Sequence, residues 1–283
     1  MDDLREFAQL FPAWWFGALG VLGLIVGSFL NVVIYRLPIM LERRWRQDIE
    51  LEAGMADSDS DPDTRYNLCW PPSSCPHCQQ AIAVKDNIPL FSWLWLRGRS
   101  RCCHQSVSVQ YPLVEVITML TFLTAGLLWL PGMALWGALI LLSFLLVLTV
   151  IDIKTLLLPD VLTLSLLWMG LLFNLSETFV SLNDAVVGAM AGYLSLWLLY
   201  WVFKYATGKE ALGYGDFKLL AALGAWLGWQ ALPNLVLVAA LSGLVVTLVW
   251  RGLRKEDTAK PLAFGPWLAM GGVFGVIMNG FNL

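Results

Sequence analysis

Charged residues are scarce in this chain. Of its 283 residues, 14% are charged and 58% are hydrophobic, whereas an average soluble domain has about 25% charged residues. A composition this apolar excludes an ordinary soluble protein and indicates one that lies in a membrane. Lipid is therefore the first partner to expect, and no nucleic-acid partner is expected.

Histidine is also scarce. The chain has two histidines, His77 and His104, and each lies beside a cysteine. A Ser-His-Asp triad needs a histidine that is free to act as a base, and a catalytic cysteine needs one too. The sequence also has no His-Glu-x-x-His motif of the zinc proteases. Serine, cysteine and metalloprotease chemistry are all disfavoured.

The N-terminus lacks the basic start of a secretory signal peptide. Asp2, Asp3 and Glu6 outnumber Arg5, and the apolar run that follows, residues 14–35, is long. A signal peptide begins with basic residues and has a shorter apolar stretch. We therefore expect this first run to be a retained transmembrane helix.

Long apolar runs fill most of the chain. About 20 apolar residues suffice for a helix to cross a bilayer. Eight runs come near that length, so the sequence predicts an all-α integral membrane protein with about eight transmembrane helices. The runs are residues 14–35, two within 112–151 on either side of Pro131-Gly132, 161–175, 185–203, 217–229, 235–250 and 262–280.

The basic residues set the expected orientation, because cytoplasmic loops carry the excess of Lys and Arg. With the N-terminus outside, Arg5 is the one of the 18 basic residues that falls outside. This orientation places Asp152 and Asp216 together at the cytosolic ends of their apolar runs. The predicted division of the chain is an N-terminal tail and first helix (1–35), a cytosolic domain (36–110) and a polytopic membrane domain (111–283).

The predicted cytosolic domain contains all five cysteines. Thiolates at Cys-x-x-Cys spacing in a reducing compartment favour zinc over disulfides. Cys75-Pro76-His77-Cys78 is a good half-site, but in Arg101-Cys102-Cys103-His104 the cysteines are adjacent, and Ser100 stands where a partner for Cys103 is expected. We predict a structural zinc held by Cys75, Cys78, Cys103 and either Cys102 or His104. The alternative is a remnant whose cysteines pack without metal.

Asp152 and Asp216 are candidate catalytic residues. Ionisable groups at membrane depth are costly, which makes them functional candidates, and two carboxylates that share a proton can act as an acid and a base. Gly213 and Gly215 support this interpretation of Asp216, because glycine allows close approach of the backbone. Each aspartate also has a structural explanation: a charge at a helix start for Asp216, and a local ion pair with Lys154 for Asp152.

A set of ordered segments spans almost the whole chain and carries a family resemblance. The segments are residues 27–38, Cys75-Pro76-His77-Cys78, residues 87–93, Arg97-Gly98-Arg99, residues 111–115, Asp152 with Leu158-Pro159-Asp160, Gly213-Tyr214-Gly215-Asp216 and Phe264-Gly265-Pro266-Trp267. In these the chain resembles the type IV prepilin peptidases, membrane aspartic proteases with a Gly-x-Gly-Asp motif, and most of all the members that serve type II secretion.

The resemblance implies a bifunctional enzyme of the bacterial inner membrane. Such enzymes remove the basic leader from prepilins or pseudopilins after a glycine, on the cytosolic side, in type II secretion or pilus assembly. They then N-methylate the new terminal residue with S-adenosylmethionine. The resemblance assigns Asp152 and Asp216 as the catalytic pair and associates the Gly98 region with methyl transfer. Ser100 departs from the family's usual zinc cysteine.

Two other classes of function are compatible with the same residues. A transporter or channel could use Asp152 and Asp216 as an ion relay, although both acids are expected near one face of the membrane. A zinc-knuckle scaffold could recruit partners while the aspartates stay inert. The oligomeric state is left open by the sequence.

Overall fold

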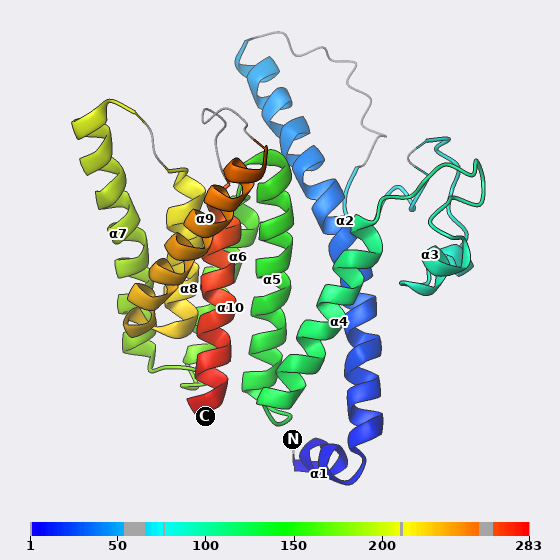
Figure 1. Ribbon diagram of the computed structural model, residues 1–283, viewed down its shortest axis with the longest axis horizontal. Helices are drawn as coiled ribbons and strands as arrows, with labels where there is room; N and C mark the ends of the chain where they lie inside the picture. Colours follow the sequence, from blue (N-terminus) through cyan, green and yellow to red (C-terminus); the bar gives the residue numbers. More distant parts are fainter. Residues whose placement is uncertain (1, 54–65, 76, 210–211, 255–262, 283) are drawn as a thin grey trace. The chain divides into compact units, whose positions relative to one another are not determined.

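The computed structural model describes residues 2–53, 66–75, 77–209, 212–254 and 263–282, and most of these are helical (Figure 1). No strand forms within them; two isolated bridges pair Ser74 with Ala81 and Arg99 with Ser106. The prediction of an all-α protein is confirmed. The helices are α1 Asp2–Leu10, α2 Pro12–Glu52, η1 Val84–Asn87, α3 Phe91–Trp95, α4 Gln110–Leu128, α5 Met133–Thr155, α6 Asp160–Asn174, α7 Leu182–Thr207, α8 Tyr214–Leu227, η2 Trp229–Ala231, α9 Leu232–Arg254 and α10 Gly265–Asn282.

Five helical segments in the described part of the chain are long and apolar enough to cross a membrane: α2, α4, α5, α7 and Trp229–Val249, which includes most of α9. All eight predicted apolar runs coincide with helices, but three of these helices are not among the five: α6 and α8, which have only 15 and 14 residues, and α10. At about 1.5 Å per residue such helices fall short of a hydrocarbon layer about 30 Å thick. The chain is a membrane protein, and eight spans remain a prediction.

The chain divides into two compact units. One contains residues 13–123, and the other contains residues 1–12 together with 124–283. The division predicted from the sequence, at residues 35 and 110, remains a prediction.

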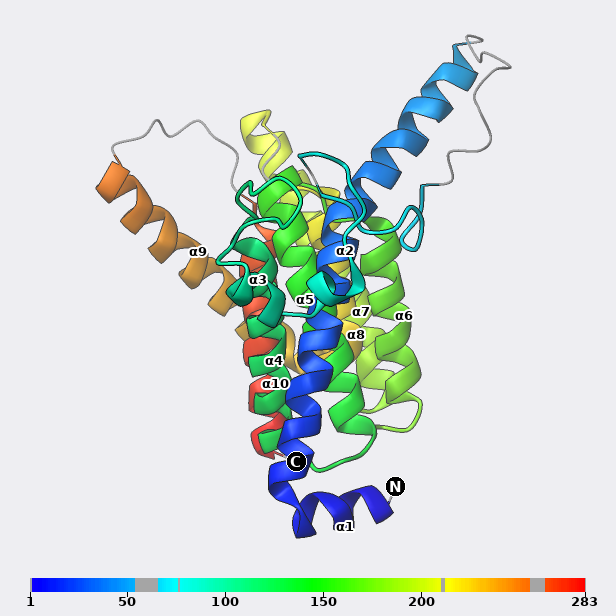
Figure 2. The same ribbon diagram turned by 90° about the vertical axis from the view of Figure 1, so that its right-hand side faces the viewer.

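In the unit of residues 13–123, α2 and α4 approach each other closely (Figures 1 and 2). A Cβ atom on Gly23 would lie 2.7 Å from the Cα of Met119, and one on Gly27 would lie 2.7 Å from the Cα of Glu115. Glycine is therefore required at these contacts. Asn31 adds a polar bond, since its Nδ2 donates to the carbonyl oxygen of Tyr111 at 3.0 Å.

In the second unit, α8 lies at the centre of a helical bundle. It packs against α6, α7, α9 and α10, and its residues from Leu219 to Leu227 are all buried. Helix α10 in turn packs along α5 and α9, as Figure 1 shows. Because neighbouring helices cover α8 on all sides, it can be shorter than a helix that faces lipid.

Two contacts fix the position of α8. The first is a backbone approach between α7 and α8, where a Cβ on Gly188 or on Gly224 would overlap the carbonyl of the other glycine. The second is a set of buried hydrogen bonds: Asn174 Nδ2 donates to the carbonyls of Ala225 and Trp226 at 2.9 and 3.1 Å, and Trp226 Nε1 donates to Leu166 at 2.8 Å. Small residues and interhelical hydrogen bonds are the usual basis of helix packing in membranes.

The contact between α7 and α8 predicts a strong effect of substitution. Gly224→Leu should lower the thermal unfolding midpoint of the detergent-purified protein, because overpacking of this kind costs about 1–3 kcal/mol or more. Gly17→Leu is the matched control, since a Cβ on Gly17 meets no atom within 4 Å. Equal midpoints for the two variants would contradict the close contact.

Candidate functional site

Asp152 lies in the last turn of α5 and is buried, with 4% of its surface exposed. Its Oδ2 accepts a hydrogen bond of 2.9 Å from the main-chain N–H of Gly265, the first residue of α10. Residues 152 and 265 are far apart in sequence, so this bond ties the end of α5 to the start of α10. The ion pair with Lys154 that the sequence allowed does not form among the described residues.

Asp216 lies in the first turn of α8 and is also buried, with 6% of its surface exposed. Its Oδ2 accepts a hydrogen bond of 3.1 Å from the main-chain N–H of Gly213, the residue before the helix. The sequence-based alternative of an acid at a helix start therefore describes part of its role. Within the described residues, the Oδ1 atoms of both aspartates have no hydrogen-bond partner.

The two aspartates are brought to one site by Leu158, which lies against Gly215, the neighbour of Asp216, and against Gly265, the donor to Asp152. Among the described residues no cation neutralises either of them. Lys218, two residues after Asp216, instead pairs with Asp160 at 2.6 Å. Two buried acids near each other, without a counter-ion, satisfy the conditions under which one carboxyl holds a proton while the other is ionised.

Three glycines lie beside the pair, and at two of them, Gly215 and Gly265, a side chain would not fit. A Cβ on Gly265 would lie 2.6 Å from Oδ2 of Asp152, and one on Gly215 would lie 2.7 Å from Cβ of Leu158. A Cβ on Gly213 would meet Asp216 Oδ2 at 3.5 Å, which is an ordinary contact. The Leu158 side chain thus lies against both Gly215 and Gly265.

The other acids weighed in the sequence have structural partners. Asp160 begins α6 and pairs with Lys218. Asp184, in the first turn of α7, accepts hydrogen bonds from Ser181, Trp229 and Gln230. Glu115 is buried in α4 and accepts a hydrogen bond of 2.7 Å from the main-chain N–H of Leu90. None of these arrangements brings two carboxylates together.

Four cysteines form a second cluster. The sulfur atoms of Cys75, Cys78, Cys102 and Cys103 all lie within 4.8 Å of one another, and Cys69 is not among them. The Sγ atoms of Cys75 and Cys103 are 3.6 Å apart, and those of Cys78 and Cys102 are 3.1 Å apart. Four thiolates around a tetrahedral zinc, at about 2.3 Å from the ion, are about 3.8 Å apart. The donor set fits zinc, and Cys102 joins it rather than His104.

Two turns of the same form build this cluster. In the first, Cys75 N donates to Gln80 O and Gln79 N donates to Cys75 O; in the second, Ser100 N donates to Gln105 O and His104 N donates to Ser100 O. Gln79 and His104 have matching positive φ angles of 58° and 57°. Ser100 therefore occupies the place that Cys75 has in the first turn, and Cys102 supplies the fourth sulfur.

The environment of Cys75 favours a thiolate. Main-chain N–H groups of Cys78 and His77 lower the pKa of the Cys75 thiol to about 6. The side-chain hydrogen bond with Cys78 raises the pKa of Cys102 to about 12. A thiolate is the form that binds metal, and a bound cation would favour deprotonation of the other thiols.

Gly98, expected near the methyl-transfer site, has a structural role. It is buried with a φ of 71°, and a Cβ there would lie 3.0 Å from the indole ring of Trp93. Its N–H donates to Trp93 O, and its carbonyl accepts from Val107 N. Both main-chain groups are thus occupied within the loop. A part in binding the methyl donor remains a prediction.

Sequence reasoning missed two residues beside the aspartates, Gly265 and Leu158. Gly265 belongs to the quoted segment Phe264-Gly265-Pro266-Trp267, which was a signal for it, although no role followed from the sequence. Leu158 likewise belongs to the quoted segment Leu158-Pro159-Asp160, but its apolar side chain gave no chemical reason to assign it a role. Its contact with Gly215 and Gly265 depends on the return of α10 to the end of α5, which local sequence does not encode.

Comparisons with known proteins identify the family of this chain. Residues 21–129 match the bacterial peptidase A24 N-terminal domain, and residues 139–248 match the type IV leader peptidase family. No solved structure matches the chain.

Several curated relatives carry the name prepilin leader peptidase/N-methyltransferase. That of Pectobacterium carotovorum subsp. carotovorum is 95% identical over 100% of both chains, and that of Dickeya chrysanthemi is 61% identical over 98% of this chain and 97% of its own. That of Aeromonas hydrophila is 53% identical over 96% of this chain and 93% of its own. The family resemblance seen in the sequence and the prediction of an enzyme are confirmed. The chain belongs to the type IV leader peptidase family.

Proposed function

We propose that this protein removes the leader peptide of prepilins or pseudopilins with Asp152 and Asp216 as its catalytic residues, and that it then N-methylates the new terminus. The observation that carries the proposal is the pair of buried carboxylates, each held by a main-chain N–H through Oδ2. The family and the names of its relatives support the class of substrate.

The geometry suits aspartic proteolysis. Because each Oδ2 is occupied by an N–H donor, the Oδ1 atoms are the ones left to act on water and on the scissile carbonyl. The ionised carboxylate takes a proton from the attacking water, and the protonated one donates a hydrogen bond to the carbonyl oxygen. Both side chains are oriented by backbone atoms, which keeps the pair in place without an added metal or base.

The membrane sets where cleavage occurs. We place the N-terminus in the periplasm, residues 36–110 in the cytosol, and the aspartates at the cytosolic face of the bacterial inner membrane. A substrate with a basic leader and a hydrophobic helix then has its scissile bond, after a glycine, at the level of the two acids. S-adenosylmethionine supplies the methyl group for the second reaction. The enzyme would serve type II secretion, whose members the chain resembles most, or pilus assembly.

The first prediction concerns the acids themselves. Asp152→Asn and Asp216→Asn keep the size of the side chain but cannot be ionised, so each should lower leader cleavage by at least about a thousandfold. The measurement is cleavage of a prepilin by purified variants in detergent, with Asp160→Asn as the control, since that acid pairs with Lys218. Processing at the normal rate by a folded Asp152→Asn or Asp216→Asn variant would refute the assignment.

The second prediction concerns the main-chain donor. Gly265→Ala places a methyl group 2.6 Å from Asp152 Oδ2, which must displace the carboxylate, so cleavage should fall by about a hundredfold, as for other small displacements in active sites. Gly213→Ala keeps its N–H and makes an ordinary contact of 3.5 Å with Asp216, so a loss of only a few fold is expected. The matched assay is prepilin cleavage at equal amounts of folded protein.

The third prediction concerns the cysteine cluster. Four sulfur ligands should hold about one structural zinc per chain, measured by elemental analysis of desalted protein. Cys102→Ser should lose most of it, and adding Ser100→Cys should restore it, because Ser100 holds the place that Cys75 has in the first turn. Cys69→Ser is the control. A wild-type zinc content near zero would show instead that the cysteines pack without metal.

A further inference from the structure

Helix α3 presents large apolar side chains to its surroundings. The exposed fraction is 64% for Phe91, 56% for Leu94 and 82% for Trp95, and Ile88 just before the helix is 49% exposed. Trp93, on the other side of the helix, packs on Gly98 and donates its Nε1 to Val107 O at 3.3 Å. The helix therefore has an anchored inner face and an uncovered outer one. Apolar patches of this kind mark interaction sites.

A hydrogen bond sets the height of α3 relative to a membrane-spanning helix. The N–H of Leu90, the residue before α3, donates to Glu115 Oε2 at 2.7 Å. Glu115 lies in the second turn of α4, which is long and apolar enough to cross a membrane. The start of α3 is thus held beside the first turns of α4, as Figures 1 and 2 also show. This is the level at which a transmembrane helix enters the headgroup region.

The charge next to this patch is positive. Arg97 and Arg99 follow the helix and are exposed, and within the described residues neither guanidinium has a carboxylate partner. The nearby acid, Asp86, is already paired with Arg101 at 2.7 Å. Two uncompensated arginines complement a negative surface and would repel a basic peptide.

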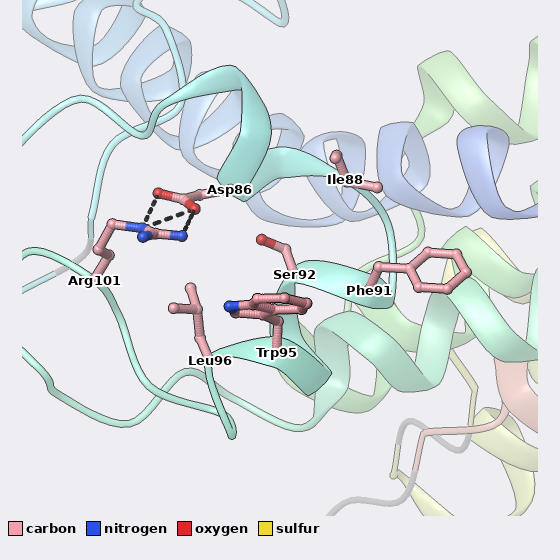
Figure 3. Close-up of a pocket in the computed structure, with 7 residues that line it drawn as sticks. All are labelled: Asp86, Ile88, Phe91, Ser92, Trp95, Leu96 and Arg101. Atoms are coloured by element: carbon pink, nitrogen blue, oxygen red, sulfur yellow. Dashed lines mark hydrogen bonds and ion pairs between the residues drawn. The ribbon is translucent and has the colours of Figure 1, made fainter.

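A shallow hollow of about 220 Å³ lies beside the outer face (Figure 3). Trp95 and Leu96 line one part of it, and the Asp86–Arg101 pair closes another. The Phe91 ring points away from this ion pair. The hollow thus combines apolar walls with a polar, ion-paired edge, a combination that suits a lipid headgroup and its first acyl carbons.

We propose that α3 is a membrane-interface anchor. Phe91, Leu94 and Trp95 insert among the headgroups of anionic lipid while Arg97 and Arg99 contact the phosphates. Tryptophan is typical of the membrane interface, and each arginine near an anionic surface contributes about 1 kcal/mol, a factor of about five in the binding equilibrium. The docked helix holds the cysteine cluster near the bilayer. The proposal rests on the membrane location and not on the peptidase assignment.

Fluorine NMR tests whether α3 lies in the membrane interface. The protein is labelled with 5-fluorotryptophan and placed in nanodiscs of phosphatidylglycerol and phosphatidylcholine. Trp95 is one of 15 tryptophans, and its fluorine resonance is identified as the one that Trp95→Phe removes; Trp93 is identified in the same way. A nitroxide on the lipid headgroup region should broaden the Trp95 resonance strongly and that of Trp93 less. A water-soluble paramagnetic chelate should broaden the Trp95 resonance less than the Trp93 resonance.

Two outcomes would overturn the proposal. Trp95 broadened by the soluble chelate and not by the lipid nitroxide means that α3 faces water. Trp95 protected from both means that protein covers the patch, such as a substrate or another part of this chain.

The double substitution Arg97→Gln/Arg99→Gln tests whether the positive charge beside α3 contributes to lipid binding. Broadening of Trp95 by the lipid nitroxide should fall severalfold in this variant, and also when wild-type protein is placed in phosphatidylcholine alone. Arg44→Gln/Lys209→Gln removes the same charge elsewhere and should leave the broadening unchanged. Equal broadening in the two double variants would exclude a role of these arginines in lipid binding.

Discussion

The packing of the unit that contains residues 1–12 and 124–283 depends on one close approach between two helix backbones. Because Gly188 and Gly224 have no side chains, α7 and α8 come into main-chain contact, and α6, α9 and α10 complete the enclosure of α8. A helix enclosed in this way does not need the length or the lipid-facing surface of a transmembrane span. It can therefore begin with a buried aspartate, because the surroundings of Asp216 are protein and not hydrocarbon. The cost of an acid at membrane depth is lowered by the same packing that positions it.

The two aspartates are oriented by main-chain donors from different parts of the chain. Asp216 accepts its hydrogen bond from Gly213, just before its own helix, whereas Asp152 accepts its bond from Gly265 on another helix. In both cases the donor is a main-chain N–H, which has no rotamers of its own and moves only if its helix moves. Within the part of the chain that the structure describes, this orientation by backbone leaves each carboxylate without a cation partner, so that one member of the pair can keep a proton. An arginine or lysine in the same place would hold both acids ionised.

The sequence alone predicted the parts of this protein that local pattern encodes. Apolar runs predicted the helices, and Asp152 and Asp216 were singled out because an acid at the end of such a run is unusual. The position of Ser100 relative to Cys103 was recognised as irregular. What local pattern could not supply was tertiary: that Asp152 is bonded to Gly265, that Leu158 fills the space beside Gly215, and that Cys102 rather than His104 completes the cluster. The number of spans also stays open, because α6 and α8 are too short to be judged by hydropathy alone.

The bond between Gly265 and Asp152 has a consequence for biosynthesis. A membrane protein is inserted from its N-terminus as translation proceeds, and Asp152 is synthesised 113 residues before Gly265. Until α10 arrives, the carboxylate of Asp152 has no main-chain donor to orient it, and α5 lacks the neighbour that α10 provides. The two acids therefore reach the arrangement described above only after residue 265 has been made. Nascent chains still on the ribosome, and products of premature termination, carry both acids without the arrangement that joins them.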